Sequence, residues 1–389
     1  FMKPTLHILL HPGMGKTATT WTQTAVLPQL TTILNLGKGG GGLGSGDESP
    51  LSLELNHLQY LLFLPITNKS SLFERYRISY NDLTEYCDLF TKLVHRYLPL
   101  LSEQNDDSAR VVVVSDEAIT GYGGVQMNIG LIAAMISCIS EKLKPWYLVE
   151  FHVVMTIREQ SSMIQSLFAF DYDELYSRFG PLDDFVEYGL SHSRNDVFGQ
   201  LFYDELYGMM RYSLDDSVSL RLVPFEKIAK SGTFAFFRDY FHFLDEQHPV
   251  IIELRDVSQE LDHVQINVNS VVDGGIRMNS ALTRGRLVRG VLYSAKRVVD
   301  LHRRSPFFRK VLSPIRDNLL KAFTAFFDRF GELRQKRSIR VNLSSEEVDK
   351  IHALYCDSNK RCEGLLDLEL AELGYPCAES EQSTMGVGC

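Results

Sequence analysis

The chain has 389 residues, of which 44% are hydrophobic and 23% are charged, and this composition is typical of a globular protein. Its length is sufficient for one large α/β domain with additions, or for two domains. No apolar run reaches the roughly 18 residues of a membrane span, and no secretory pattern is visible, so we expect a cytoplasmic protein. The six cysteines form no CxxC pair or Cys/His cluster with zinc spacing, so we expect reduced thiols and no metal. The net charge of −9 gives no reason to expect a nucleic-acid partner.

A short apolar run at residues 5–10 predicts a buried strand, and helical periodicity begins at Thr17. Between them, Gly13 and Gly15 allow the positive φ of a tight turn and expose backbone N–H groups. Unpaired amides, the start of a helix and the Lys16 ammonium together attract an anion. The segment therefore predicts a phosphate or sulfate site.

A nucleoside-triphosphate P-loop requires a glycine five residues before Gly15, where this chain has Leu10. The hexapeptide at 16–21 instead resembles, position by position, the 5′-phosphosulfate loop of sulfotransferases that use 3′-phosphoadenosine 5′-phosphosulfate (PAPS). The resemblance implies that Lys16 acts on the leaving group and that Trp21 stacks on adenine. The cofactor-binding residues that it implies here are Gly13, Met14, Gly15, Lys16, Thr17, Ala18, Thr19, Thr20 and Trp21.

A second motif follows the apolar, β-rich run at residues 147–157. Arg158 leaves this predicted strand, and Ser166 lies about two helical turns further on, so a guanidinium fork and a hydroxyl can meet on one phosphate. The pair of Arg158 and Ser166 resembles the arginine and serine that bind the 3′-phosphate of the cofactor in sulfotransferases. We interpret the two motifs together as a signature of PAPS binding.

The valine run at residues 111–114 predicts a central parallel strand, and acidic residues follow it. Ser115-Asp116-Glu117 resembles the bacterial Ser-x-Glu version of the catalytic base, which favours Glu117; a solvated carboxylate at a strand end is the alternative. Asp116 and His11 are rival candidates for the base. His152 lies inside an apolar strand, so we expect a core residue there.

One element of the family is missing. Cytosolic sulfotransferases close the cofactor site with an Arg-Lys-Gly triplet, which this chain lacks. Arg284 and Arg286 are candidates to substitute as a second clamp on the 3′-phosphate. Residues 224–228, with Glu226 at a strand end, resemble a further family feature.

Alternating strand and helix patterns predict an α/β fold: a doubly wound, mainly parallel sheet with a P-loop-like phosphosulfate loop and additional C-terminal helices. We expect the sulfotransferase core at residues 2–270, with a glycine-rich loop at 36–50 that is either a connector or a lid. A helical extension at 271–378 would complete the core, and 379–389 would be a disordered tail.

Residues 277–340 carry seventeen Lys or Arg and four acids, and aromatic residues alternate with the basic ones after residue 307. Residues 307–340 are therefore a candidate surface for peripheral membrane contact or self-association, or else a core-facing helix with solvated charges.

The expected reaction moves a sulfuryl group from PAPS to a hydroxyl of a small-molecule, glycan or lipid acceptor, without a metal. Two alternatives stay open. One is a P-loop ATPase or kinase with Asp116-Glu117 as a Walker B-like site; the other is a non-catalytic nucleotide-binding homologue.

Overall fold

The computed structural model describes residues 3–13, 17, 19–37, 54–55, 58, 61, 80–102, 110–116, 119, 129–170, 175, 179–194, 196–262, 271–272, 275–276 and 342–377. The chain forms two compact units. The first combines Phe1–Ile164, Val186–Ile266 and Ser344–Cys389, and the second combines Gln165–Phe185 and Asn267–Leu343.

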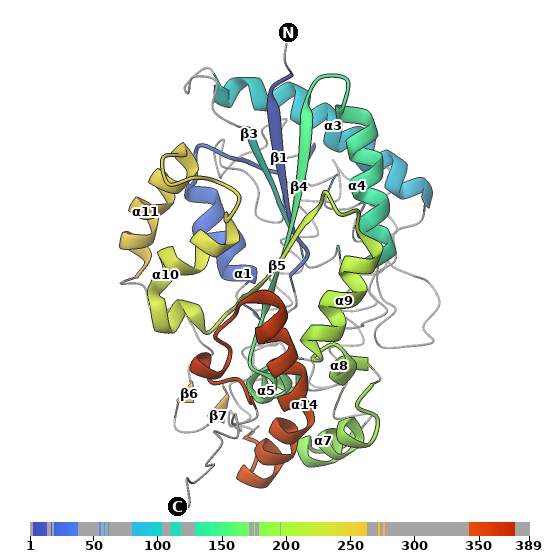
Figure 1. The fold of residues 1–389 in the computed structure, drawn as a ribbon, viewed down its shortest axis with the longest axis vertical. Helices are drawn as coiled ribbons and strands as arrows, with labels where there is room; N and C mark the ends of the chain where they lie inside the picture. The colour runs from blue at the N-terminus through green and yellow to red at the C-terminus, as the bar shows by residue number, and fades with distance from the viewer. Residues whose placement is uncertain are drawn as a thin grey trace, which may run out of the picture. The chain divides into compact units, whose positions relative to one another are not determined.

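The first unit is built on a five-stranded sheet in which every neighbouring pair is parallel, so the predicted α/β class is confirmed (Figure 1). The strand order is β2-β3-β1-β4-β5. The strands are β1 (Thr5–His11), β2 (Leu34–Asn35), β3 (Arg110–Ser115), β4 (Leu148–Ile157) and β5 (Ser219–Pro224). Strands β1 and β3 read as apolar runs because they are buried on both faces.

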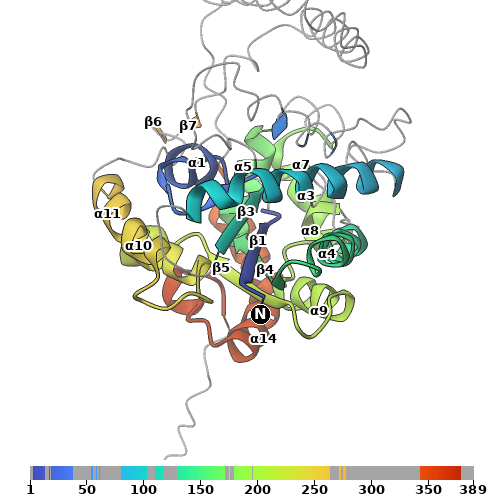
Figure 2. The same cartoon turned by 90° about the horizontal axis from the view of Figure 1, so that it is seen from above.

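Helices cover both faces of the sheet. Helices α1, α10 and α11 lie on one side and α4 and α9 on the other (Figures 1 and 2). The helices of this unit that cover the sheet, counted over described residues, are α1 (Thr19–Trp21), α3 (Tyr80–Ser102), α4 (Ile129–Leu143), α9 (Tyr203–Ser213), α10 (Lys227–Tyr240) and α11 (Pro249–Leu261). The side with α1, α10 and α11 encloses a continuous core in which Leu9, Val113 and Val154 of the sheet meet Phe236 and Leu254.

The connections that follow the neighbouring strands β1 and β4 run in opposite directions across the sheet. The connection after β1 leads past β3 to β2 at one edge, whereas the connection after β4 leads to β5 at the other edge. The carboxyl ends of β1 and β4 are therefore a topological switch point, and ligands of open α/β sheets bind at such points. Both predicted motifs begin at these two ends.

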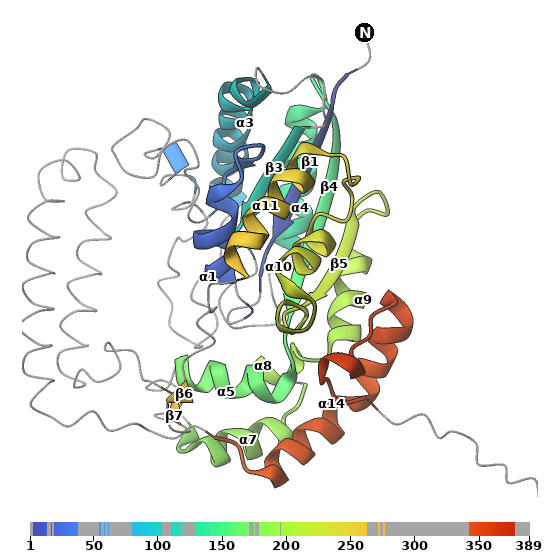
Figure 3. The same cartoon turned by 90° about the vertical axis from the view of Figure 1, so that its left-hand side faces the viewer.

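The carboxyl-terminal helix α14 (Ser344 as N-cap, helix Ser345–Leu366) belongs to the same unit and packs beside α9 (Figure 3). The helix begins with a capping box: the Ser344 hydroxyl accepts from the Glu347 N–H, and the Glu347 carboxylate accepts from the Ser344 N–H. The Tyr355 hydroxyl donates to the Phe198 carbonyl at 2.9 Å, which fixes α14 against the short helix α8 (Asp196–Gly199).

The sequence predicts one helix over residues 197–214, and this is wrong. The chain forms α8, leaves helical geometry at Phe202 (φ −82°, ψ 84°) and restarts as α9. Gly199, the last residue of α8, packs closely on the Arg194 carbonyl, which lies 2.6 Å from where a Cβ would stand.

The second unit contains the antiparallel pair β6 (Val271–Val272) and β7 (Gly275–Ile276) and a cluster in which the Phe185 ring lies 5.4 Å from Phe168 and 5.3 Å from Phe179. Helix α5 (Gln160–Phe170) and helix α7 (Leu182–Ser191) each contribute residues to both units. The candidate surface at 307–340 and the glycine-rich loop beyond Gly37 lie outside the described residues. Among the helices described, none has the length and apolar character to cross a membrane.

Candidate functional site

Five buried side chains meet at the carboxyl ends of β1, β3 and β4. We call them the polar cluster: His11, Thr17, Gln23, Ser115 and Thr156. His11 stands opposite Ser115 in the β1–β3 register, and Thr156 projects from the same face of β4, because alternate residues of a strand share a face. Strand register thus brings together residues that are more than 100 positions apart in the chain.

His11 is at the centre of the polar cluster and is fully buried. Its Nδ1 lies 2.8 Å from Ser115 Oγ and its Nε2 lies 3.2 Å from Thr156 Oγ1. Burial lowers the pKa of His11 to about 3, so the imidazole is neutral at physiological pH. Since both ring nitrogens are engaged with hydroxyls, His11 is well suited to orient the ends of three strands.

Thr17 links the first motif to β4. Its Oγ1 lies 2.6 Å from Thr156 Oγ1, and Thr156 is two residues before Arg158 of the second motif. The residue after Lys16 is therefore tied to the strand that carries Arg158.

A π-helical turn over Thr22–Val26 follows α1 and carries Gln23. The Gln23 amide donates to both the carbonyl and the hydroxyl of Ser115 at 3.2 Å. Single π turns inside helices are frequent at functional sites. This turn connects the segment after the first motif to the end of β3.

No side chain larger than that of glycine fits at position 13. A Cβ at Gly13 would lie 2.1 Å from Thr19 Cγ2 and 3.4 Å from the His11 ring. Gly13 is not among the described residues with positive φ, so the expectation that it supplies a left-handed turn is wrong. Its bare Cα lets the turn after β1 approach α1.

Trp21 is half-buried, and its ring centre lies 5.7 Å from the Phe237 ring of α10. The core cluster on this side of the sheet includes Phe237, and Trp21 packs against it. One side of the indole therefore packs on the core, and the rest of the ring is partly exposed. The backbone of Thr20 lies in α1, between Thr19 and Trp21.

Asp116 is fully buried directly after β3. Its N–H donates to the His11 carbonyl at 3.1 Å, which continues the β1–β3 pairing by one step. The carboxylate therefore belongs to the same edge of the sheet as the polar cluster.

Arg158 follows β4 and is half-buried. The Tyr203 hydroxyl donates to the Arg158 carbonyl, and the guanidinium lies over the Phe225 ring, 5.3 Å from its centre. Glu226 is close by and accepts from the Glu159 N–H at 2.9 Å and from the Tyr375 hydroxyl at 2.6 Å. Burial raises the pKa of Glu226, against smaller lowering effects from these hydrogen bonds and from the Arg158 charge.

Ser166 lies in α5 and is buried, and its Oγ has no hydrogen-bond partner within the described part of the chain. It belongs to the second unit, whereas Arg158 belongs to the first. Both stand on the segment that continues from β4 into α5, as the sequence predicts.

Of the predicted site residues, the structure describes His11, Gly13, Thr17, Thr19, Trp21, Arg158 and Ser166, and the backbone of Thr20. It brings His11, Gly13, Thr17 and Thr19 together at the end of β1. The remaining predicted site residues lie outside the described part: Met14, Gly15, Lys16, Ala18, Glu117, Arg284 and Arg286.

The sequence reasoning missed Gln23, Thr156, Tyr203 and Tyr375. A signal for Thr156 was present, because Glu150, His152 and Thr156 are polar positions of the same parity within an otherwise apolar strand. Gln23 and the two tyrosines carry no such signal, since their partners are distant in sequence.

No known protein family matches this chain, and no curated protein sequence is similar to it.

Proposed function

We propose that the chain is a sulfotransferase that transfers the sulfuryl group of PAPS to a hydroxyl of a small-molecule, glycan or lipid acceptor. The observation that carries the proposal is the 2.6 Å hydrogen bond between Thr17 and Thr156. It connects the motif that resembles a phosphosulfate loop to the strand that ends at Arg158. Arg158 is two residues after Thr156, which corresponds to about 7 Å between their Cα atoms in an extended chain. One nucleotide is therefore long enough to contact both motifs.

The residues around the ends of β1 and β4 fit such a nucleotide. Gly13 leaves room for the turn to approach α1, Trp21 offers a partly exposed aromatic ring, and the half-buried Arg158 carries a cation. When bound, PAPS supplies the activated sulfuryl group.

In this proposal different residues bind the two ends of the nucleotide. Lys16, Thr19 and Thr20 hold the 5′-phosphosulfate oxygens, and Lys16 neutralises charge on the bridging oxygen as the S–O bond breaks. Arg158 and Ser166 bind the 3′-phosphate, with Arg284 and Arg286 as a further clamp.

Glu117 accepts the proton of the acceptor hydroxyl while that oxygen forms the new bond to sulfur. The neutral, doubly hydrogen-bonded His11 acts as a positioning residue that keeps Ser115 and Thr156 in place. Its low pKa makes it a poor base at neutral pH.

The test compares adenosine 3′,5′-bisphosphate with adenosine 5′-phosphate by calorimetry. One charge-assisted pair contributes about 1.5–3 kcal/mol, so the wild type should bind the bisphosphate at least about tenfold more tightly. Arg158→Gln should reduce this preference by at least about tenfold. Arg255→Gln, which changes an exposed arginine paired with Glu246 on α11, should keep it. If Arg158→Gln lowered the affinities for the bisphosphate and for adenosine 5′-phosphate by the same factor, the assignment of Arg158 to the 3′-phosphate would be contradicted.

A P-loop ATPase or kinase is the second candidate, and the burial of Asp116 at the end of β3 favours it, since a Walker B acid lies at such a strand end. Against it, Leu10 occupies the position of the first P-loop glycine and is fully buried in β1. A thermal-shift comparison separates the two: stabilisation by MgATP but not by the bisphosphate would favour the ATPase.

The third candidate is a binding module without catalysis. It predicts bisphosphate binding but no molecule that gains a sulfate in cells expressing the protein. An untargeted mass-spectrometric search for such molecules in those cells distinguishes it from the enzyme and identifies the acceptor.

A further inference from the structure

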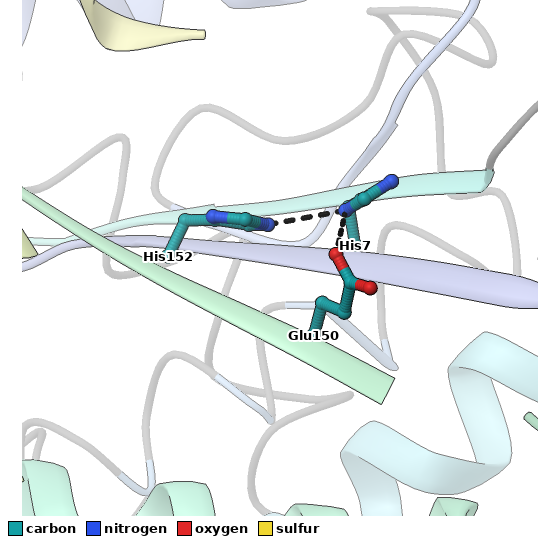
Figure 4. A group of neighbouring side chains, drawn as sticks. All are labelled: His7, Glu150 and His152. Atoms are coloured by element: carbon teal, nitrogen blue, oxygen red, sulfur yellow. Dashed lines mark hydrogen bonds and ion pairs between the residues drawn. The ribbon is translucent and has the colours of Figure 1, made fainter. Parts of the chain in front are cut away.

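A second group of polar side chains lies on the same face of the sheet, four residues before His11 along β1. It consists of His7 on β1 and Glu150 and His152 on β4 (Figure 4). His7 and Glu150 stand opposite each other in the β1–β4 register, and His152 is the next residue of β4 on that face. All three side chains therefore converge on one point beside the two strands.

Their potential ligand atoms have the spacing of a metal site. His7 Nδ1 lies 3.1 Å from His152 Nε2 and 3.3 Å from a Glu150 carboxylate oxygen. All three atoms are within 4.8 Å of one another. In a tetrahedral zinc site with bonds of about 2.0–2.1 Å, neighbouring ligand atoms are about 3.3–3.4 Å apart. Small side-chain movements would thus allow one ion to contact all three.

The donor atoms are of the type that binds a cation. His7 Nδ1 and His152 Nε2 lie at hydrogen-bond distance, so one of them carries a proton in the metal-free protein. Metal binding would release this proton and leave one imidazole nitrogen of each histidine as a ligand. Glu150 adds a negative charge to the ligand set.

The surroundings hold the histidines in place. The His152 ring is stacked on Phe243, with ring centres 3.6 Å apart and planes 7° apart. The two neighbouring histidines have other partners: His242 Nε2 lies 2.7 Å from Ser219 Oγ, and His248 Nδ1 accepts from the Val250 N–H at 3.2 Å. Glu150 is 47% exposed, so a fourth position can be filled by water.

We propose that His7, Glu150 and His152 form a binding site for a divalent transition-metal ion, with Zn²⁺ as the best match. Two imidazole ligands select against Mg²⁺ and Ca²⁺, which prefer oxygen. Two histidines and one carboxylate with an open fourth position are a known zinc ligand set. The ion would link β1 to β4 near the amino ends of these strands, whereas the polar cluster lies at their carboxyl ends. This site does not depend on the proposed sulfotransferase activity, and it departs from the expectation of a metal-free protein.

The test uses the full chain, freed of metal with a chelator and titrated with Zn²⁺ against a chromophoric competitor. The wild type should bind one equivalent that the triple variant His7→Asn/Glu150→Gln/His152→Gln does not bind. Co²⁺ should give the visible absorption bands of tetrahedral coordination in the wild type, and Zn²⁺ should raise its melting temperature.

Glu150→Gln is the decisive single variant because a half-exposed, isosteric change leaves the core intact. It should weaken Zn²⁺ binding by at least about tenfold, as should His152→Gln. The matched controls are Glu141→Gln and His192→Gln, at an exposed glutamate of α4 and an exposed histidine directly after α7. Both should leave Zn²⁺ affinity within about twofold of the wild type. Equal Zn²⁺ binding by the wild type and the triple variant, or an unchanged affinity in Glu150→Gln, would overturn the proposal.

Discussion

Thr17 and Thr156 are 139 residues apart in the chain, and their hydroxyl oxygens lie 2.6 Å apart in the fold. Thr17 belongs to the turn after β1 and Thr156 to the end of β4, and these two strands are neighbours in the sheet. The hydrogen bond is therefore a direct link between the two motifs that suggest a nucleotide site. Because His11 Nε2 also contacts Thr156, a change at Thr156 affects the whole polar cluster.

Thr156→Val tests this link. Removal of the hydroxyl leaves buried groups of Thr17 and His11 without one partner, which should cost about 1–3 kcal/mol of unfolding free energy. Binding of adenosine 3′,5′-bisphosphate should weaken as the first motif loses its anchor, and calorimetry measures this. Thr91→Val is the matched control, since Thr91 donates to the Cys87 carbonyl within α3, away from the site. Wild-type affinity in Thr156→Val would show that the link does not position the motif.

Gly13→Ala tests the close approach of the turn to α1. The new Cβ would lie 2.1 Å from Thr19 Cγ2, so the turn must shift, at a cost of about 1–3 kcal/mol. Bisphosphate affinity should fall with it. The double variant Gly13→Ala/Thr19→Ser removes the obstructing methyl group and should recover most of both losses. Gly130→Ala, in a helix with nothing within 4 Å of the new atom, should leave the affinity unchanged and the stability neutral or raised by up to about 1 kcal/mol. A double variant as weak as the single one would refute the steric explanation.

Much of the sheet was predictable from the sequence, because its signals are local. The valine run before Ser115 and the apolar run before Arg158 are strands as predicted, and the helix patterns between them cover the sheet. His152 is buried within β4, as expected of a core residue. These features depend on periodicity and burial, which each segment carries by itself.

The site was predictable only in part, because its contacts depend on strand register. Nothing near Thr156 indicates that Thr17 is its partner, and the group of His7, Glu150 and His152 exists only because β1 and β4 pair as they do. The space required at Gly13 depends on where Thr19 lies after the turn, which local sequence does not specify.

His11 predicts a specific pH dependence of stability. Its pKa is about 3 in the folded protein, and an unfolded histidine has a pKa of about 6.5. Below pH 6.5 the unfolded chain binds a proton that the folded protein excludes, so stability falls as the pH drops toward 3. The contribution is about 1.4 kcal/mol per pH unit in the middle of this range. Urea unfolding of the chelator-treated protein between about pH 4 and 6 measures the slope.

His11→Gln removes this contribution. The variant should be less stable at neutral pH, because Ser115 and Thr156 lose a partner, but its stability should fall less steeply with acid by about 1.4 kcal/mol per pH unit. His192→Gln, at an exposed histidine, should keep the wild-type slope. If His11→Gln had the same slope as the wild type, His11 would have to be protonated in the folded state.

Gly37→Ala tests how tightly the chain after β2 packs against the end of β3. A Cβ there would lie 2.3 Å from the backbone nitrogen of Ser115, and a backbone atom in a central strand cannot move aside as a side chain can. The strain should destabilise the fold by at least about 2 kcal/mol, measured by urea unfolding. It should also weaken bisphosphate binding, since Ser115 contacts both His11 and Gln23. Gly208→Ala, inside α9 with open space around it, should be neutral or stabilising by up to about 1 kcal/mol. A Gly37→Ala protein as stable as Gly208→Ala would mean that β2 and β3 separate at this end at little cost.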